Sequence, residues 1–475
     1  MKKRFLFGLL ALLICLAGCA AAGQETSTPH TSLGGDSSSP SVESSADREE
    51  STSTGEISLP AGFDSTEEPP LRLWEALTAL FPDPELEAEI ISFSLFIEVQ
   101  AGDSIANRLA AAFAEQGYDE TLWREITGNS LHVWESIYTN EPEISPFVRL
   151  LSMGKPGENK TTVMTFGGDI SFADNYVTMR YLKTTENGLA DCLAPEWFTQ
   201  MQQADIAVLN NEFAISRRGL PMNGKVYTFR GDPENTALYH ELGVDLVTLA
   251  NNHVFDYGEE AFCDTLDSLR KYGIDYAGAG RTAEESQSPM YYLVDGRKIA
   301  FVSATRAEKN ILTPEATETS PGVFRCYDPA RLQEVLAEAK AESDYVVLLI
   351  HWGREKSHVL EDVQEETAPL YLEAGADLII GAHAHRLQGI EFIDGKAVFY
   401  NLGNFWFDDY SIETGLVRFE LSADGKESFY FLPGMQAGCV TSYEFGTSVG
   451  RTILDHLESY SKNVTIRDDG LIIGD

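Results

Sequence analysis

From Thr161 onward, apolar and polar positions follow one another in short blocks. Five apolar runs of strand length each end in polar residues: TTVMTFGGD, ADIAVLNNE, VDLVTLANNH, YVVLLIHWG and ADLIIGAHAH. Stretches of helical periodicity lie between several of them: EEAFCDTLDSLRKYG, PARLQEVLAEAKAES and TAPLYLEAG. Strands that alternate with helices predict an α/β fold with a largely parallel sheet.

Three further segments have the pattern of β-hairpins: MYYLVDGRKIAFVSA, IEFIDGKAVFYN and LVRFELSADGKESFYFL. Each has a DG turn between two apolar runs, which is typical of a tight connection between antiparallel strands. We therefore expect antiparallel strands beside the parallel ones, in two sheets packed together. This α/β domain is predicted to span residues 160–440.

The chain on either side of this domain has a different pattern. Residues 19–68 are rich in Ser, Thr, Gly, Pro and Glu, which predicts a disordered tether. Residues 69–155 show helical periodicity, as in LRLWEALTALF and DSIANRLAAAFAEQGY, and predict a small helical accessory module. Residues 441–475 are expected to form a short polar tail with one helical stretch.

Residues 1–18 have the pattern of a secretory signal peptide. A basic start, KKR, precedes an apolar run of about a dozen residues, which is short for a membrane span, and the segment ends in LAGC. LAGC resembles the lipobox of bacterial lipoproteins, which implies cleavage before Cys19 and a lipid anchor on its sulfur. The alternative is an ordinary signal peptide with a coincidental cysteine. The mature chain is expected outside the cytoplasm, anchored to the cell membrane.

The formal net charge of −39 at pH 7 narrows the set of partners. Such an acidic chain argues against nucleic acid as a ligand, and a polyanionic substrate would need a local cationic site. Four cysteines remain after the signal peptide and Cys19: Cys192, Cys263, Cys326 and Cys439. They contain no CxxC pair that would indicate a zinc knuckle, and both disulfides and buried free thiols are compatible with their spacing.

The polar endings of the five apolar runs consist of residue types that bind metal ions. They supply one or two candidates each: Asp169, Glu212, Asn252 with His253, His351, and His383 with His385. Carboxyl ends of strands gather at one edge of an α/β sheet, so we expect these side chains to converge. Mixed carboxylate, amide and imidazole ligands suit one or two divalent ions such as Mn, Fe or Zn. Two such ions could bind a phosphoryl oxygen and activate water.

His383 and His385 stand one residue apart, directly after an apolar run and between glycines. In an extended chain, side chains two residues apart point the same way, which would place both imidazoles toward a common ligand. A single Asp, Asn or His at a strand end is more often a turn former, a cap or a core residue than a ligand. The joint occurrence at five strand ends is what indicates a site.

Six segments resemble the ordered motifs of the bacterial capsule synthesis protein CapA family: GGDISF, NNEFAIS, FRGDPENTALYHELGVDLVTLANNHVFDYG, HWGREK, GAHAHRLQGIE and NLGNFWFD. The resemblance covers roughly residues 160–410. It implies a calcineurin-like metallophosphoesterase fold, a four-layer α/β/β/α sandwich, and a role in poly-γ-glutamate capsule production.

The same resemblance implies a role for each motif residue. For the first metal it implies Asp169 and His385, with Glu212 as the bridge between two ions. The second metal would be completed by three residues: Asn252, His351 and His383. His253 would act on the reacting phosphoryl group, and Asp256 would orient His253.

One position departs from the superfamily pattern. A histidine usually stands two residues after the first aspartate, and this chain has Ser171 there. The first metal site would therefore have fewer ligands, so fold and metal binding are firmer expectations than turnover. Arg230 and Arg386 are the candidate residues for holding an anionic substrate, with solvated surface charge as the alternative.

These observations lead to three hypotheses. The first is a lipid-anchored protein of the CapA type that acts in synthesis, export or processing of an anionic capsule polymer, through metal-assisted hydrolysis. Membrane subunits of capsule synthesis are candidate partners. The second is a non-catalytic polymer-handling or scaffold subunit that kept the fold. The third is a general extracytoplasmic phosphoesterase.

Overall fold

The computed structural model describes residues 148–152, 160–294, 297–309 and 311–474. The predicted signal peptide, Cys19, the tether and residues 69–147 of the helical module lie outside these residues. Within the described part of the chain, no helix combines the length and the apolar character that crossing a membrane requires.

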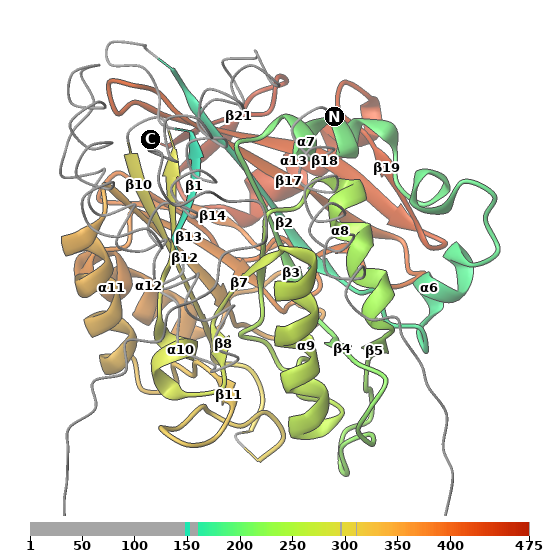
Figure 1. Cartoon of the computed structure of the whole chain (residues 1–475). Coiled ribbons are helices and arrows are strands. Elements are labelled where there is room, and N and C mark those ends of the chain that lie inside the picture. Colours follow the sequence, from blue (N-terminus) through green and yellow to red (C-terminus); the bar gives the residue numbers. More distant parts are fainter. Residues whose placement is uncertain (1–147, 153–159, 295–296, 310, 475) are drawn as a thin grey trace, which may run out of the picture. The chain divides into compact units, whose positions relative to one another are not determined.

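Two large sheets form the centre of the domain (Figure 1). The seven-stranded sheet has the order β1 (Val148–Ser152), β9 (Met290–Val294), β10 (Arg297–Thr305), β12 (Tyr345–His351), β13 (Leu378–Ala382), β15 (Lys396–Phe399), β14 (Ile390–Ile393). The ten-stranded sheet has the order β20 (Val464–Ile466), β21 (Leu471–Gly474), β18 (Glu427–Ala437), β17 (Ile412–Leu421), β2 (Thr162–Ile170), β3 (Ile206–Asn211), β6 (Leu246–Thr248), β7 (Asp275–Ala277), with β16 (Asn404–Trp406) on β2 and β19 (Val440–Tyr443) on β18.

Each large sheet has a parallel half that carries the predicted apolar runs. β2, β3, β6 and β7 are parallel in one sheet, and β10, β12, β13 and β15 are parallel in the other. The three predicted hairpins are present as antiparallel pairs: β9–β10, β14–β15 and β17–β18. Two small sheets add the pairs β4 (Ala214–Ile215) with β5 (Arg230–Gly231) and β8 (Ala279–Gly280) with β11 (Gly322–Val323).

Helices cover the outer faces of both sheets, except for the last one, Ser448–Tyr460, whose buried apolar side chains pack into the core between the sheets. They are α6 (Val177–Leu182), α7 (Pro195–Gln203), α8 (Ala237–Leu242), α9 (Gly258–Tyr272), α10 (Ala283–Gln287), α11 (Ala330–Glu342), α12 (Asp362–Ala374) and α13 (Ser448–Tyr460), with short 3₁₀ turns at Gly188–Asp191 and Pro233–Thr236. α9 shows the local logic: acidic Glu259 and Glu260 lie in its first turn, and it ends at Gly273, whose φ of 66° suits glycine.

Three hydrophobic cores account for the four layers. Side chains of the two sheets pack face to face between them, as Phe166 of one sheet does near Phe301 of the other. Trp197 of α7 packs in a second core between the ten-stranded sheet and its helices, and Leu336 of α11 packs in a third core beside the seven-stranded sheet. Because β3, β6 and β12 are buried on both faces, their sequences are mainly apolar runs rather than alternating ones. The predicted four-layer α/β/β/α sandwich is confirmed.

The ends of the domain differ from the sequence-based boundaries. Val148–Ser152, predicted in the helical module, forms β1 and pairs in parallel with β9. Residues 441–475 were expected as a polar tail with one helical stretch, and that stretch is α13. It belongs to the folded domain together with β20 and β21, and β21 pairs with β18. The apolar residues of the short segment VTIRDDGLII are spread over two brief strands, so neither has a pattern strong enough to indicate a strand.

All four cysteines of the domain are free thiols, and three of them are buried: Cys192, Cys326 and Cys439.

Candidate metal centre

The predicted ligands lie at the carboxyl ends of strands from both sheets. Asp169 ends β2 with Ile170, Glu212 follows β3, and Asn252 follows β6, all in the ten-stranded sheet. His351 is the last residue of β12, and His383 follows β13, both in the seven-stranded sheet. Convergence was expected at one sheet edge, and the structure instead brings together the edges of two facing sheets.

Two groups of side chains there are close enough to hold a metal ion each. Glu212, His351 and His383 form one group, and Asp169, Glu212 and His385 form the other, with the ligand atoms of each group within 4.8 Å of one another. Glu212 belongs to both groups, which is the arrangement of a bridging carboxylate. Every one of these residues is buried except His385, whose side chain is 12% exposed.

The oxygen that Glu212 presents to the histidines has no hydrogen-bond partner among the described residues. Its Oε1 lies 3.7 Å from Nε2 of His351 and 3.9 Å from Nε2 of His385. These separations are too long for hydrogen bonds, and they are about those expected of two ligands that share an ion with bonds of roughly 2 Å. His383 Nδ1 is also buried without a hydrogen bond in the described structure, whereas Asp169 Oδ2 lies 2.9 Å from Nδ1 of His385. Buried polar atoms without partners fit a metal ion as their missing partner.

The electrostatics of the groups favour the same conclusion. Burial raises the pKa of Glu212 well above its usual range, and the nearby charge of Asp169 raises it further. Burial lowers the pKa of His351, as does the proximity of His383. Neutral imidazoles are the form that binds metal, and a divalent ion would compensate the two buried carboxylates.

Asn252 and His253 lie beside the group formed by Glu212, His351 and His383. Asn252 Oδ1 lies 2.8 Å from Nε2 of His351, which fits its predicted role as a ligand beside that histidine. His253 donates from Nδ1 to Oδ2 of Asp256 at 2.8 Å, and its Nε2 lies 4.0 Å from Oε1 of Glu212. The second nitrogen of His253 therefore faces the ligand groups, while Asp256 holds the first.

His383 and His385 reach different groups because the backbone after β13 is not extended. Their φ angles are 98° and 53°, in the left-handed region that residues other than glycine rarely adopt. The ring centroids are 6.2 Å apart, and each imidazole enters its own group. The expectation of an extended backbone at this pair is therefore wrong, although both imidazoles lie in groups that share Glu212.

Two asparagines hold ligands in place and were not assigned a role from the sequence. Asn210 Nδ2 donates to Oδ1 of Asp169 at 2.8 Å and to Oε2 of Glu212 at 3.3 Å. Asn404 Oδ1 lies 2.7 Å from Nδ1 of His385, leaving Nε2 of that ring toward Glu212. Both asparagines could have been found from the sequence, because the motifs LNNE and NLGNFWFD place a polar asparagine within or beside an apolar run.

Ser171 directly follows β2 and is two residues after Asp169. It is fully buried, its backbone N–H donates to Trp406 O, and its hydroxyl accepts from Ala173 N at 3.4 Å. Among the described residues, the Asp169 group contains three candidate ligands of the His and carboxylate type: Asp169, Glu212 and His385.

Neither arginine predicted to bind substrate is engaged by a carboxylate in the described structure. Arg230 stacks over the ring of Tyr257 at 4.2 Å and donates from Nη1 to the backbone oxygen of Arg218, at the edge of a cavity of about 270 Å³. Arg386 donates from Nη1 to the backbone oxygen of His385 at 2.7 Å. Both are near the site in sequence, and substrate binding by them stays a prediction.

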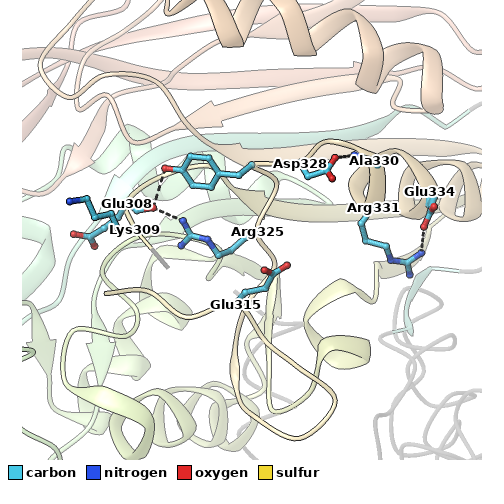
Figure 2. Close-up of a pocket in the computed structure, with 9 residues that line it drawn as sticks. Glu308, Lys309, Glu315, Arg325, Asp328, Ala330, Arg331 and Glu334 are labelled. Carbon is cyan, nitrogen blue, oxygen red and sulfur yellow. Dashed lines mark hydrogen bonds and ion pairs between the residues drawn. The ribbon is translucent and has the colours of Figure 1, made fainter. Parts of the chain in front are cut away.

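A larger cavity of about 810 Å³ contains none of the candidate ligands (Figure 2). Its lining carries charges of both signs from the segment after β10 and the start of α11: Glu308, Lys309, Glu315, Arg325, Tyr327, Asp328, Ala330, Arg331 and Glu334. Most of its lining residues are charged, whereas small-molecule sites are lined mainly by hydrophobic and aromatic side chains.

The fold and the site together define a class of protein: an α/β/β/α sandwich with a buried carboxylate and imidazole cluster able to hold metal. The model of the family described as bacterial capsule synthesis protein PGA_cap matches residues 163–409, just over half of the chain. The chain belongs to this family, and the resemblance to CapA proteins is confirmed.

Individual relatives agree with this placement. The PGA biosynthesis protein CapA of Bacillus subtilis (strain 168) is 29% identical over 297 residues, which cover 60% of this chain and 77% of that protein. The capsule biosynthesis protein CapA of Bacillus anthracis is 28% identical over 282 residues, which cover 57% of this chain and 66% of that protein. Among solved structures, TT1561 of Thermus thermophilus is 12% identical with a TM-score of 0.30, and the match covers 54% of this chain and 94% of that one.

Proposed function

We propose that this chain acts in the synthesis, export or processing of an anionic capsule polymer of the poly-γ-glutamate type, through a divalent metal centre at the meeting edges of its two sheets. Family membership supports the biological role. The observation that carries the metal centre is the buried Glu212, which is shared by two ligand groups and whose Oε1 has no hydrogen-bond partner among the described residues.

The proposal includes an extracytoplasmic location, with the mature chain anchored to the membrane through a lipid on Cys19. The basic start, the short apolar run and LAGC support it. The acidic polymer and the acidic chain would repel each other at long range, so binding would depend on the metal centre and on local cations such as Arg230 and Arg386.

The chemistry proposed for the site is metal-assisted hydrolysis of a phosphoester or an amide-type bond. A divalent ion supplies Lewis acidity and lowers the pKa of bound water. Asp169, Glu212 and His385 would hold one ion, and Glu212 with His351, His383 and Asn252 would hold the other. His253, fixed by Asp256, would present Nε2 to donate a proton to a leaving oxygen or to stabilise its negative charge.

The first test is the metal content of the purified chain. We expect at least one bound divalent ion per chain, lost in His351→Ala and in His383→Ala. His456→Ala is the matched control, because His456 is 48% exposed and pairs with Glu413 away from the site. Hydrolysis of bis(4-nitrophenyl) phosphate with added Mn²⁺ should follow the metal content, and activity in the metal-stripped chain would exclude the mechanism.

A second candidate, the non-catalytic polymer-handling or scaffold subunit, is favoured by Ser171. The position that usually supplies a histidine is buried serine, and among the described residues that ligand group contains three candidate ligands of the His and carboxylate type. Complementation separates the candidates: a strain without the gene should lose surface polymer, and His351→Ala should fail to restore it if catalysis is required. Restoration by His351→Ala would favour the scaffold, and phosphodiester hydrolysis without any effect on polymer would favour a general phosphoesterase.

A further inference from the structure

Lys225 is a buried cation within a surface loop. It lies in the segment between β4 and β5, where Val226 is 88% exposed and Tyr227 is 62% exposed. The Lys225 side chain is only 2% exposed. Burying an ammonium group is costly unless it is paired and hydrogen-bonded, so this lysine must have a specific set of partners.

Three acceptors surround the Lys225 ammonium group. Its Nζ lies 2.6 Å from Oδ1 of Asp256 and 2.8 Å from Oε2 of Glu308, and it also donates to the backbone oxygen of Asn252. A lysine has three donors, and here each has an acceptor. The group therefore has no donor left for a substrate, which excludes direct contact with the reacting atoms.

Two of these acceptors belong to residues of the candidate metal centre. The backbone oxygen of Asn252 accepts a hydrogen bond from the Lys225 ammonium group. The side-chain Oδ1 of Asn252 lies 2.8 Å from Nε2 of His351. Asp256 Oδ1 accepts a hydrogen bond from Lys225, and Asp256 Oδ2 accepts one from Nδ1 of His253. Lys225 thus lies directly behind a predicted ligand and behind the carboxylate that orients His253.

The third acceptor, Glu308, is fixed from the side of the larger cavity. Arg325 donates to the backbone oxygen of Glu308, as Figure 2 shows, and the Tyr327 hydroxyl donates to the same oxygen at 3.0 Å. The Thr313 hydroxyl lies 3.2 Å from the Asn252 backbone oxygen and 3.3 Å from Oε2 of Glu308. The segment after β10 therefore contacts two of the three Lys225 partners, Glu308 and the Asn252 backbone oxygen.

From this geometry we infer that Lys225 is a positioning residue: it fixes the Asn252 backbone and the Asp256 carboxylate, and through them the side chains of Asn252 and His253 at the metal centre. The inference rests on the proposed metal centre. An ordinary buried ion pair would stabilise the fold and leave the metal site unchanged, so the decisive measurement concerns the bound metal.

The experiment uses the full chain, stripped of metal and titrated with Mn²⁺ by calorimetry. Lys225→Met keeps the aliphatic stem and removes the charge. We expect it to weaken Mn²⁺ binding by about 10- to 100-fold, the usual effect of losing a group that orients a ligand. Lys225→Arg, which keeps the charge, should recover part of the affinity. The control is Lys340→Met on α11, whose lysine pairs at 2.8 Å with Asp377, at the opposite end of β13 from His383.

Visible absorption of bound Co²⁺ gives a second readout that a merely structural role would not change. The d–d bands should shift in Lys225→Met, because the position of Asn252 among the ligands changes, and they should be unchanged in Lys340→Met. Circular dichroism checks folding without metal. If Lys225→Met does not fold, Glu308→Gln tests the same network with Lys225 and Asp256 intact, and we expect a smaller loss of affinity with the same direction of spectral shift.

The outcomes separate the inference from the proposed function. Mn²⁺ affinity within twofold of the unsubstituted chain, with unchanged Co²⁺ bands in the folded variant, would overturn the role of Lys225 alone. Absence of Mn²⁺ and Co²⁺ binding by the unsubstituted chain would overturn the metal centre and the positioning role together.

Discussion

His383 and His385 show how neighbours set the charge of otherwise identical side chains. Burial, together with the proximity of His385, lowers the pKa of His383 to about 3. Burial also acts to lower the pKa of His385, but the Asp169 carboxylate, 2.9 Å from Nδ1, outweighs it and raises that pKa. Without metal, one imidazole is therefore kept neutral while its neighbour is held beside a carboxylate.

This difference predicts a pH-dependent stability for the metal-free chain. The folded pKa of His383 is below its unfolded value of 6.5, so the unfolded chain binds a proton that the folded chain does not. The free energy of unfolding should fall as the pH decreases from 6.5 toward 3, and it should be retained above 6.5. For one group the limiting slope is about 1.4 kcal/mol per pH unit.

Urea unfolding with a chelator present at pH 6.5, 5.5 and 4.5 measures this slope. His383→Gln removes the titrating group, so its free energy of unfolding should fall less steeply than that of the unsubstituted chain, by about 1 kcal/mol per pH unit. Equal slopes would contradict the buried, neutral state of His383.

At the scale of elements, β21 turns a presumed tail into part of the core. Ile472 is 5% exposed and packs between the two sheets, whereas Ile473, the next residue, is 43% exposed. The alternation is that of a strand with one buried face. The two isoleucines therefore form a matched pair on one element.

We expect Ile472→Ala to lower the free energy of unfolding by about 2–4 kcal/mol, because it removes buried methyl groups and leaves a cavity. Ile473→Ala should change the same quantity by less than about 0.5 kcal/mol. Urea unfolding of the two variants checks both values. Two variants that match the unsubstituted chain would show that residues after 460 behave as the tail that composition suggests.

The elements that the sequence predicts well are those whose patterning is set by burial alone. The five apolar runs and the three DG hairpins are present because a strand covered on both faces, or turned at Asp–Gly, needs those residue types. The pattern does not say which sheet a strand joins. β1 and β21 were missed because pairing with β9 and β18 stabilises segments whose own pattern is weak.

The same division holds for the candidate site. Residues that end strands, such as Glu212 and His351, could be predicted because strand ends have a known place in the fold. Lys225 could not, since it lies in an irregular loop and its burial follows from contacts with segments about 30 and 80 residues farther along the chain. Asn210 stands within an apolar run, where its contact with Asp169 depends on strand register.

For the whole molecule, the decisive feature is that the ligand groups join two sheets. Glu212 follows a strand of the ten-stranded sheet, and His351 and His383 belong to the seven-stranded sheet. The sheets otherwise meet through side-chain packing in the core between them. A metal ion bound by Glu212, His351 and His383 would join the two sheets through its coordination bonds, at the edge where β3, β12 and β13 end.

Metal binding should therefore stabilise the two sheets together. With Mn²⁺ at about 100 times its Kd, linkage contributes about 2.7 kcal/mol to the free energy of unfolding, and for a domain of about 315 residues the Tm should rise by roughly 4 °C. Calorimetric scans with a chelator and with Mn²⁺ measure the shift, and Glu212→Gln, which alters the ligand common to both groups, should remove most of it.

Hydrogen exchange shows where the stabilisation acts. Exchange of the amides at the ends of both β3 and β13 should slow with Mn²⁺, while exchange in the β17–β18 turn near Gly425 should not. Slowing at only one sheet would mean that the ion is held within one layer, and the bridge through Glu212 would then be wrong.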